Sequence, residues 1–435
     1  MTSNNTTRPP LYFGWYVLAA VTFIAFVNAG SRSCFGIFVI PMSEDFGWNR
    51  FTISVVAAIG AVVGGVAQPF LGYAFDRLGA RKVILTSLVT VGLATAALGL
   101  TFNFIFLLIV FGFIASISNS GAALGRGALL ARWFIRKRAT VVSIGAVGTS
   151  AGSLLLVPFS MYLLQATGDN WRITWAALGM IVLVLAVPLA FLFIRDDPGK
   201  VGLRPYGEID RSGGGRTGGD IGNRGPLEVD RWIESFRSPP VWQMSGAFFV
   251  CGFTTLIMSV HFVPYAIDVG VSRNLAATIF GVTMGLNVIG GLGSGVLADR
   301  FGRKNVLASA YFIRGCGYIV LLLVPSTLGL WLFAVFAGMS WIATVSLTNT
   351  LTADVYGLRS LGTISGITFL CHQIGSLAGV LLGGYLYDLT GSYTLPFAIV
   401  GSMLFPAALS AFTIKEREYS TRYQTALAGV ANSSN

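Results

Sequence analysis

Five titratable side chains stand inside long apolar runs of the sequence, where a charge is costly. They are three arginines and two histidines: Arg32, Arg126, Arg314, His261 and His372. A central Arg costs roughly 2.5–3.5 kcal/mol on membrane-insertion scales, so such a residue needs an aqueous cavity or a partner. A guanidinium matches a carboxylate in bidentate fashion, and an imidazole can carry a proton near neutral pH. These residue types are suited to binding an anion and moving a proton.

The acidic residues offer these cations no evident partner. All 18 Asp and Glu residues fall in segments predicted as loops, tails or helix ends. Without a buried carboxylate, an anionic solute can serve as the partner, so we infer a positively biased cavity. Structural interpretations remain open: Arg32 and Arg126 can reach the headgroups or a gate, Arg314 can bond backbone carbonyls, and each His can be a packing donor.

Neutral polar side chains in the same apolar runs can complete a binding site. Buried asparagines more commonly bond across helices, and the aromatic residues more commonly pack in a core. The candidates are Asn28, Asn119, Tyr265, Asn287, Trp341, Asn349 and Gln373.

The composition predicts helices that cross a membrane and position these residues. Only 11% of the 435 residues are charged, against roughly 25% in a soluble domain. A bilayer core requires about 20 apolar residues per helical crossing. Twelve runs qualify, which predicts an all-α membrane protein with twelve transmembrane helices at 13–40, 50–73, 83–101, 104–129, 139–165, 172–194, 241–267, 275–297, 305–324, 328–352, 362–387 and 393–414.

The chain divides into two related halves. We predict an N-terminal six-helix half over 1–194, a cytoplasmic linker over 195–240, a second six-helix half over 241–414 and a cytoplasmic tail over 415–435. The linker contains a polar, Gly-rich stretch typical of a flexible connection. A constant separation of 223 residues indicates duplicated halves; it joins Pro41 to Pro264, Gly72 to Gly295, Asp76 to Asp299 and Arg77 to Arg300.

The Lys and Arg residues predict the orientation. With both termini in the cytoplasm, cytoplasmic segments carry 23 of the 29 Lys and Arg residues and outer loops carry three. This is the positive-inside distribution. The net charge of +11 lies in short clusters between apolar runs, which argues against nucleic acid binding. The first apolar run lacks an A-x-A-like cleavage site, so we expect a first membrane helix and not a cleaved signal.

Two similar segments predict a conformational latch between helices. Gly72-Tyr-Ala-Phe-Asp76-Arg77-Leu-Gly79-Ala-Arg81-Lys82 joins helices 2 and 3, and Gly295-Val-Leu-Ala-Asp299-Arg300-Phe-Gly302-Arg303-Lys304 joins helices 8 and 9. The Asp can pair with a basic neighbour or face a neighbouring helix N-terminus. The alternative is a loop that only sets topology. The latch residues are Gly72, Asp76, Arg77, Gly79, Arg81, Gly295, Asp299, Arg300, Gly302 and Arg303.

These two segments resemble the signature loop of the major facilitator superfamily, and the resemblance covers residues 12–414. It implies two pseudo-symmetric six-helix bundles in which helices 1, 4, 7 and 10 line a cavity. Arg32 on helix 1 then becomes the first candidate for substrate contact, followed by Arg126 on helix 4. Arg314 falls on helix 9, which is peripheral in that fold.

A finer resemblance is to the branch of monocarboxylate transporters and oxalate/formate antiporters. It rests on Gly14-Trp15-Tyr16, Phe46-Gly47-Trp48 and the stretch 133–148. It also rests on His372-Gln373-Ile-Gly375 followed by Gly391-Ser392-Tyr393, which fits the bacterial members of this branch. The substrate-binding Arg that this branch places on helix 8 has no counterpart, since 275–297 contains neither Arg nor Lys. The helix-11 Lys of the antiporters corresponds to His372 or Gln373.

Other kinds of chemistry find no support in the sequence. There is no phosphate-cradling Walker loop, and the Gly-rich run 290–295 lies inside an apolar run and lacks dinucleotide-binding spacing. The four cysteines lack metal-ligand spacing and are expected to be free thiols. We therefore expect that the protein is not an enzyme and binds no cofactor and no metal. Transport is expected to be driven by gradients instead of ATP.

The sequence thus predicts a secondary transporter for a small organic anion, a monocarboxylate or dicarboxylate, by proton symport or anion exchange. Protons and membrane lipid are the other expected partners, and we expect a monomer in a bacterial inner membrane. A drug or cation exporter is one alternative, which the lack of a buried carboxylate disfavours. A non-transporting membrane sensor is another, which the short linker and tail disfavour.

Overall fold

The computed structural model describes residues 12–48, 50–207, 225–229 and 231–420. The side chains of 29–32, 40, 50–51, 54, 273–274 and 277 also lie outside the described part. Every named element within those ranges is a helix. A bilayer core has no water to bond exposed backbone groups, and a helix satisfies them within its own segment. The predicted all-α fold is confirmed.

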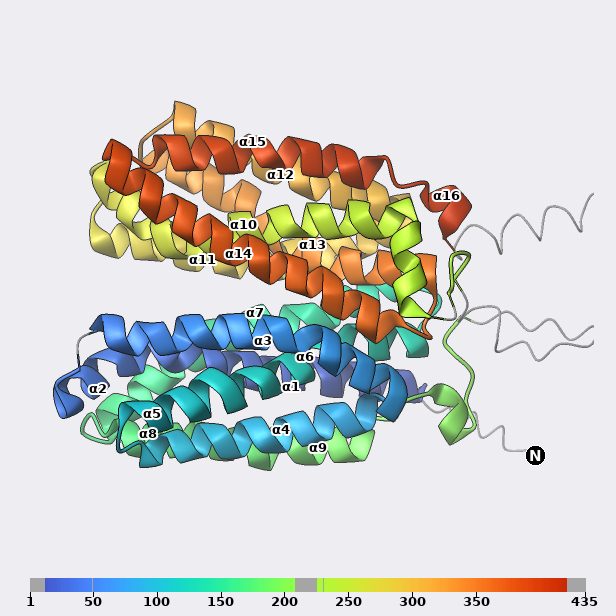
Figure 1. Cartoon of the computed structure of the whole chain (residues 1–435), viewed down its shortest axis with the longest axis horizontal. Coiled ribbons are helices and arrows are strands. Elements are labelled where there is room, and N and C mark those ends of the chain that lie inside the picture. The colour runs from blue at the N-terminus through green and yellow to red at the C-terminus, as the bar shows by residue number, and fades with distance from the viewer. Residues whose placement is uncertain (1–11, 49, 208–224, 230, 421–435) are drawn as a thin grey trace, which may run out of the picture.

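Six spans form the N-terminal half, drawn from blue to green in Figure 1. Two of them continue through short π-helical turns, η3 (Leu108–Ala115) and η4 (Val182–Ala186). The spans are α1 (Phe13–Ser33), α3 (Arg50–Leu78), α4 (Ala80–Ala97), α5 to α6 (Phe104–Leu107 and Ser116–Trp133), α7 (Arg138–Ala166) and α8 to α9 (Trp171–Ile181 and Val187–Phe193).

Six spans form the C-terminal half, drawn from yellow-green to red in Figure 1. They are α10 (Pro239–Asp268), α11 (Arg273–Phe301), α12 (Arg303–Leu323), α13 (Thr327–Tyr356), α14 (Leu361–Thr390) and α15 (Thr394–Phe412). In the described part of the chain, eleven helices are long and apolar enough to cross a membrane, and a shorter apolar stretch in α1 adds a twelfth. Each helix coincides with one predicted run to within a few residues.

The first predicted run, 13–40, differs from a single continuous helix. α1 ends at Ser33, a 3₁₀ segment η1 (Cys34–Phe38) follows, and α2 (Val39–Phe46) continues the chain. The sequence around the break is Ala29-Gly-Ser-Arg-Ser33. Gly and Ser are weak helix formers, so this stretch is the natural place for the helix to change its winding. The break immediately follows Arg32.

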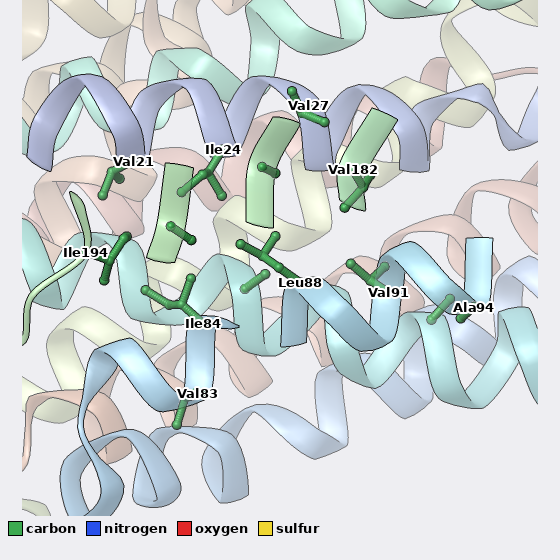
Figure 2. Close-up of a cluster of buried hydrophobic side chains, with 14 of the residues drawn as sticks. Val21, Ile24, Val27, Val83, Ile84, Leu88, Val91, Ala94, Val182 and Ile194 are labelled. Carbon is green, nitrogen blue, oxygen red and sulfur yellow. The ribbon is translucent and has the colours of Figure 1, made fainter. Parts of the chain in front are cut away.

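A core of branched apolar side chains holds each half together. Figure 2 shows part of the N-terminal core, where Ile24 from α1, Ile84 and Leu88 from α4 and Val182 from η4 point toward one another. All four are buried. By contrast, large apolar residues such as Phe70 remain exposed on the outer faces of the helices. Apolar side chains facing outward are what a lipid environment requires.

The two halves meet mainly through two helix pairs, α3 with α14 and α7 with α11, and α13 also contacts α6 and α7. We call the end of the molecule that carries residues 195–207 and 231–238 the linker end, at the right of Figure 1, and the opposite end the far end. Gly72 lies against Gly362, and Gly295 lies against Ser143, both toward the linker end. Toward the far end of α11, Gly281 and Gly285 face open space. The halves therefore touch at the linker end.

Candidate functional site

Arg126 is a cation with an unsatisfied group between the two halves. It lies on α6, seven residues before the end of the helix at Trp133, which is about 10 Å along the axis. Its Nε donates to the Ala123 carbonyl at 3.4 Å. Its Nη1 is buried, and no acceptor among the described residues lies within hydrogen-bonding distance. An unpaired buried guanidinium group is costly, so this site is suited to an added acceptor.

Asn349 of the C-terminal half lies against Gly127, the residue that follows Arg126. A Cβ added at Gly127 would come within 3.4 Å of the Asn349 Nδ2, which brings α13 against α6 at this level. Asn349 follows Arg126 by the same 223 residues that separate the latch segments. The two residues are therefore equivalent positions of the two halves that meet across the interface. The fold therefore places Asn349 of α13 against the turn of α6 that carries Arg126.

Two further predicted residues, Asn28 on α1 and Asn119 on α6, are buried in the N-terminal half. The Nδ2 of Asn119 donates to the Ala115 carbonyl at 2.9 Å. Neither Oδ1 has a hydrogen-bond partner among the described residues. Arg32, the first candidate from the sequence, lies on α1 one turn beyond Asn28, and its side chain is outside the described part.

The predicted residues of the C-terminal half mostly bond to neighbouring helices of that half. His261 contacts the Tyr393 hydroxyl at 3.3 Å and the Val380 carbonyl at 3.2 Å. Tyr265 donates to the Leu321 carbonyl at 2.8 Å. The Oδ1 of Asn287 accepts the Ile342 N–H at 3.1 Å. These contacts match the structural interpretations of these residues.

Three other predicted residues lie near mid-depth of the C-terminal half. Trp341 on α13 lies 6.0 Å from the Arg314 guanidinium. Gln373 on α14 reaches the other half, where its Nε2 donates to the Ala61 carbonyl at 3.3 Å. The neighbouring His372 packs its ring against Phe248 at 4.8 Å. Gln373 therefore lies at the interface between the halves.

Asp76 caps a helix of the opposite half. Its carboxylate accepts the N–H groups of Gly362 and Thr363 at 2.9 and 2.8 Å and the Thr363 hydroxyl at 2.8 Å. These are residues of the first turn of α14, which begins at Leu361. A carboxylate at a helix N-terminus satisfies free N–H groups and interacts favourably with the helix dipole. Of the two predicted arrangements, Asp76 adopts the helix-terminus contact.

Asp299 makes the equivalent contact with α7. Its carboxylate accepts the N–H groups of Ala139 and Thr140 at 3.2 and 2.8 Å and the Thr140 hydroxyl at 2.6 Å. Arg303 also approaches it, with an N–O distance of 3.8 Å. Each half thus caps one helix of the other.

The remaining latch residues support this geometry. Gly79 and Gly302 adopt φ values of +90° and +99°, which only glycine tolerates readily, so each connects two helices in a single residue. Arg77 and Arg300 are exposed and lie over the rings of their neighbours Tyr73 and Phe301.

A second pair of caps lies outside the membrane spans. The Arg81 N–H donates to Asp196 at 2.7 Å, and the Arg303 N–H donates to Glu416 at 3.0 Å. Burial raises the pKa of Asp196, but the Arg81 N–H and Lys200 together lower it by more than burial raises it. The pKa of Asp196 therefore lies below its ordinary value. In each half, an acid that follows the sixth span therefore caps the third span: Asp196 caps α4, and Glu416 caps α12.

The structure also contains a buried ion cluster that the sequence analysis missed. Asp354, at the end of α13, is 1% exposed and pairs with Arg138 of the N-terminal half at 2.7 Å and with Arg303. The expectation that no carboxylate is buried is therefore wrong for Asp354. Its position near a helix end suggested exposure, and Arg138 belongs to a basic cluster that resembles an ordinary topogenic signal. The sequence feature that could have indicated the ion cluster is a basic cluster in one half together with a single acid, Asp354, near a helix end of the other half.

We predict that Asp76→Ala destabilises the closure of the linker end. The change removes three hydrogen bonds at a helix N-terminus, worth about 1–2 kcal/mol, which shifts the population by roughly 5- to 30-fold. Spin labels at Lys82 and Asn305, measured by pulsed electron paramagnetic resonance, should show a longer distance. Asp45→Ala at the far end is the matched control, since Asp45 pairs with Arg172 inside one half. Unchanged distances in both Asp76→Ala and Asp299→Ala would exclude a latch.

Comparison with protein families gives one match that spans most of the chain. The model described as Major Facilitator Superfamily matches residues 21–380. Among curated proteins, the uncharacterized MFS-type transporter YcxA of Bacillus subtilis (strain 168) is 27% identical over 394 residues, which are 88% of this chain and 91% of that protein. Monocarboxylate transporter 12 of Rattus norvegicus is 25% identical over 426 residues, which are 92% and 85% of the two chains.

Solved structures share the fold at low sequence identity. The proton:xylose symporter XylE bound to 6-bromo-6-deoxy-D-glucose superposes with a TM-score of 0.73 at 14% identity, covering 95% of this chain and 99% of that one. The transporter FucP in the outward conformation superposes with a TM-score of 0.67 at 17% identity, covering 91% and 98%.

Proposed function

This chain belongs to the Major Facilitator Superfamily, and on that basis we propose that it carries a small organic anion, a monocarboxylate or dicarboxylate, by alternating access. It is a multi-pass integral membrane transporter and not an enzyme. Within the superfamily it is similar to the monocarboxylate transporters, of which numbers 11 and 12 are relatives at 26% and 25% identity. Those names support an organic anion as substrate.

The observation that carries the proposal is the buried Nη1 of Arg126. The group lacks an acceptor among the described residues and lies between the halves, where alternating access requires a substrate site. A carboxylate would supply both the missing hydrogen bond and the missing negative charge. The free Oδ1 atoms of Asn28 and Asn119 accept hydrogen bonds, and so they suit the hydroxyl groups of a substituted acid.

The transport cycle is proposed to move the halves about this site. The contacts of Asp76 and Asp299 with the opposite half hold the linker end closed. Breaking those contacts would open the linker end. The distribution of Lys and Arg supports a cytoplasmic linker end with both termini on that side, in a bacterial inner membrane.

Arg32 is the second proposed substrate contact, at the break between α1 and η1. We predict that Arg32→Ala lowers carboxylate uptake by at least about tenfold, as expected for loss of one charged hydrogen bond. Arg32→Lys should retain part of the activity because it keeps the charge. Uptake of a labelled carboxylate into proteoliposomes is the measurement. If both variants transport like the parent protein, Arg32 does not contact the substrate.

Substrate counterflow tests the proposed function as a whole. Proteoliposomes are loaded with one member of a panel of mono- and dicarboxylates, and uptake of the labelled acid is followed with and without an imposed pH gradient. Carboxylate counterflow supports the proposal, and stimulation by the gradient distinguishes symport from exchange. Efflux of ethidium without carboxylate counterflow would favour a cation exporter. Ligand binding without counterflow would favour a sensor.

A further inference from the structure

A buried cation in the C-terminal half plays no part in the proposed anion site. Arg314 on α12 is 2% exposed, and its five N–H groups are matched by five acceptors. Nε reaches the Ser340 hydroxyl at 3.4 Å, and Nη1 reaches Cys251 Sγ at 3.7 Å and the Thr254 hydroxyl at 3.2 Å. Nη2 reaches the Ser340 carbonyl at 2.9 Å and the Thr344 hydroxyl at 3.3 Å. Its hydrogen bonds are satisfied.

The charge of Arg314 remains uncompensated by these partners. None of them is a carboxylate, and the ion pairs found among the described residues do not include Arg314. A buried charge without a counter-charge is costly in a medium of low dielectric constant. Of its direct partners, only Cys251 has a side chain that becomes an anion near physiological pH, since Ser and Thr hydroxyls do not ionise.

The surroundings of Cys251 favour a thiolate. Its sulfur is fully buried and lies 3.1 Å from the Thr344 hydroxyl and 3.7 Å from the Arg314 Nη1. His372 lies on the facing turn of α14, where its ring is 4.8 Å from that of Phe248 and its carbonyl lies against Gly252. A thiolate is stabilised by a neighbouring Arg and a neighbouring imidazolium. A guanidinium and a hydroxyl therefore contact the sulfur, and an imidazole lies on the helix packed against it.

His372 connects this cluster to the interface between the halves. Its carbonyl lies against Gly252, the residue after Cys251, so α10 and α14 are in close contact there. Its Nδ1 is 3.2 Å from Gln373 Oε1, and Gln373 in turn bonds the Ala61 carbonyl of the other half. His372 is partly exposed, whereas Cys251 and Arg314 are buried.

We propose that Cys251 and His372 are the proton-carrying pair of this transporter, an inference that rests on the proposed function in its symport form. The S–H bond of Cys251 breaks, the electron pair stays on sulfur, and the proton passes to a ring nitrogen of His372. The products are a thiolate beside Arg314 and an imidazolium at the interface. The imidazolium releases its proton to one side of the membrane, and a proton from the other side restores the thiol.

Other titratable groups face the cluster from the packed helices. Tyr311 and Tyr318 approach from α12, and the Tyr318 hydroxyl donates to the Thr254 carbonyl at 3.1 Å. Cys371 precedes His372 on α14. Their phenol and thiol groups are neutral in their ordinary state. Cys251 and His372 are therefore the pair whose charge the Arg314 guanidinium controls.

Transport assays separate coupling from substrate binding. Cys251→Ser keeps the size and polarity of the side chain but removes the ionisable group. We expect carboxylate counterflow close to that of the parent protein, and a loss of at least about tenfold in accumulation driven by a pH gradient, as expected for loss of a proton-transfer group. Cys316→Ser is the matched control and should retain both activities. Full gradient-driven accumulation in Cys251→Ser would overturn the proposal.

Infrared spectroscopy tests the pair without reference to the substrate. In a variant whose only cysteine is Cys251, the S–H stretching band should disappear as pH rises through neutrality. Arg314→Gln should restore the band at the same pH, because the stabilising charge is lost. A band that persists at high pH in the variant whose only cysteine is Cys251 would overturn the proposal even if carboxylates are transported. Absence of any carboxylate counterflow, with the band behaving as expected, would instead reject the proposed substrate.

Discussion

Replacing Arg126 by Ala should raise the KM for the transported carboxylate by roughly 10- to 150-fold. A hydrogen bond to a charged group contributes about 1.5–3 kcal/mol, and each 1.4 kcal/mol corresponds to about a tenfold change in affinity. The buried Nη1 of Arg126 has no acceptor among the described residues, so the bound substrate is the group that would lose this contact. The measurement is the concentration dependence of carboxylate uptake into proteoliposomes.

Two further variants make the Arg126 result interpretable. Arg126→Lys keeps the charge but loses the planar fork of donors, so its KM should lie between those of Ala and the parent protein. Arg136→Ala, an exposed cation near the same end of α6, should behave like the parent protein. A lower maximal rate with an unchanged KM in Arg126→Ala would assign Arg126 to a gate instead of the binding site.

Replacing Asp354 by Ala should lower the free energy of unfolding by about 3–5 kcal/mol, the usual cost of removing one partner of a buried ion pair. Asp354 is surrounded by Arg138 of the N-terminal half and Arg303 of its own half, and all three are nearly inaccessible to solvent. Its removal takes the nearest carboxylate away from two buried guanidinium groups, whereas Asp299 lies farther, at 3.8 Å from Arg303. Thermal unfolding in detergent micelles is the measurement.

The control for Asp354→Ala is the removal of an exposed carboxylate in the same chain, that of Asp45. Asp45→Ala breaks the exposed pair with Arg172 and should produce a much smaller change, since solvent screens surface pairs. Combining Asp354→Leu with Arg138→Met and Arg303→Met should recover much of the lost stability, because no charge is then left buried. Equal effects of Asp354→Ala and Asp45→Ala would show that the buried cluster does not stabilise the closed linker end.

The two halves use equivalent helices but unequal charges. Asp76 and Asp299 make the same three-bond cap on α14 and α7. Only the α7 side adds the buried ion cluster around Asp354. Opening the linker end thus requires breaking a carboxylate cap on each side and, on the α7 side, separating a buried ion pair as well. We expect the α7–α11 contact to be the stronger of the two.

Hydropathy was sufficient to predict the helices. Each of the twelve apolar runs became a helix, because a bilayer leaves a long apolar segment no other way to satisfy its backbone. The break after Ser33 was not predicted, because the apolar segments on either side of Gly30-Ser-Arg-Ser33 predict one continuous run. Hydropathy measures transfer into lipid and carries little information on local winding.

The candidate site was predicted in part. The repeated Gly and Asp positions indicated that the latch segments matter, and one of two stated arrangements for Asp76 is observed. The contact of Asn349 with Gly127, beside Arg126, was not predicted, although Arg126 and Asn349 were both candidates. The partners of His261, Tyr265 and Asn287 all come from distant parts of the chain, and residue type alone does not identify them.

The sequence by itself determined that this chain crosses the membrane about twelve times in two repeated halves and that its membrane interior is rich in cations. These properties follow from local composition and spacing, which act on each helix separately. Only the tertiary structure decided the partners of these cations: Arg138 pairs with Asp354, Arg314 bonds neutral groups and a thiol, and the Arg126 Nη1 has no acceptor among the described residues. The pairs of Arg138 and Arg314 join helices more than 25 residues apart, and the fold alone brings those together.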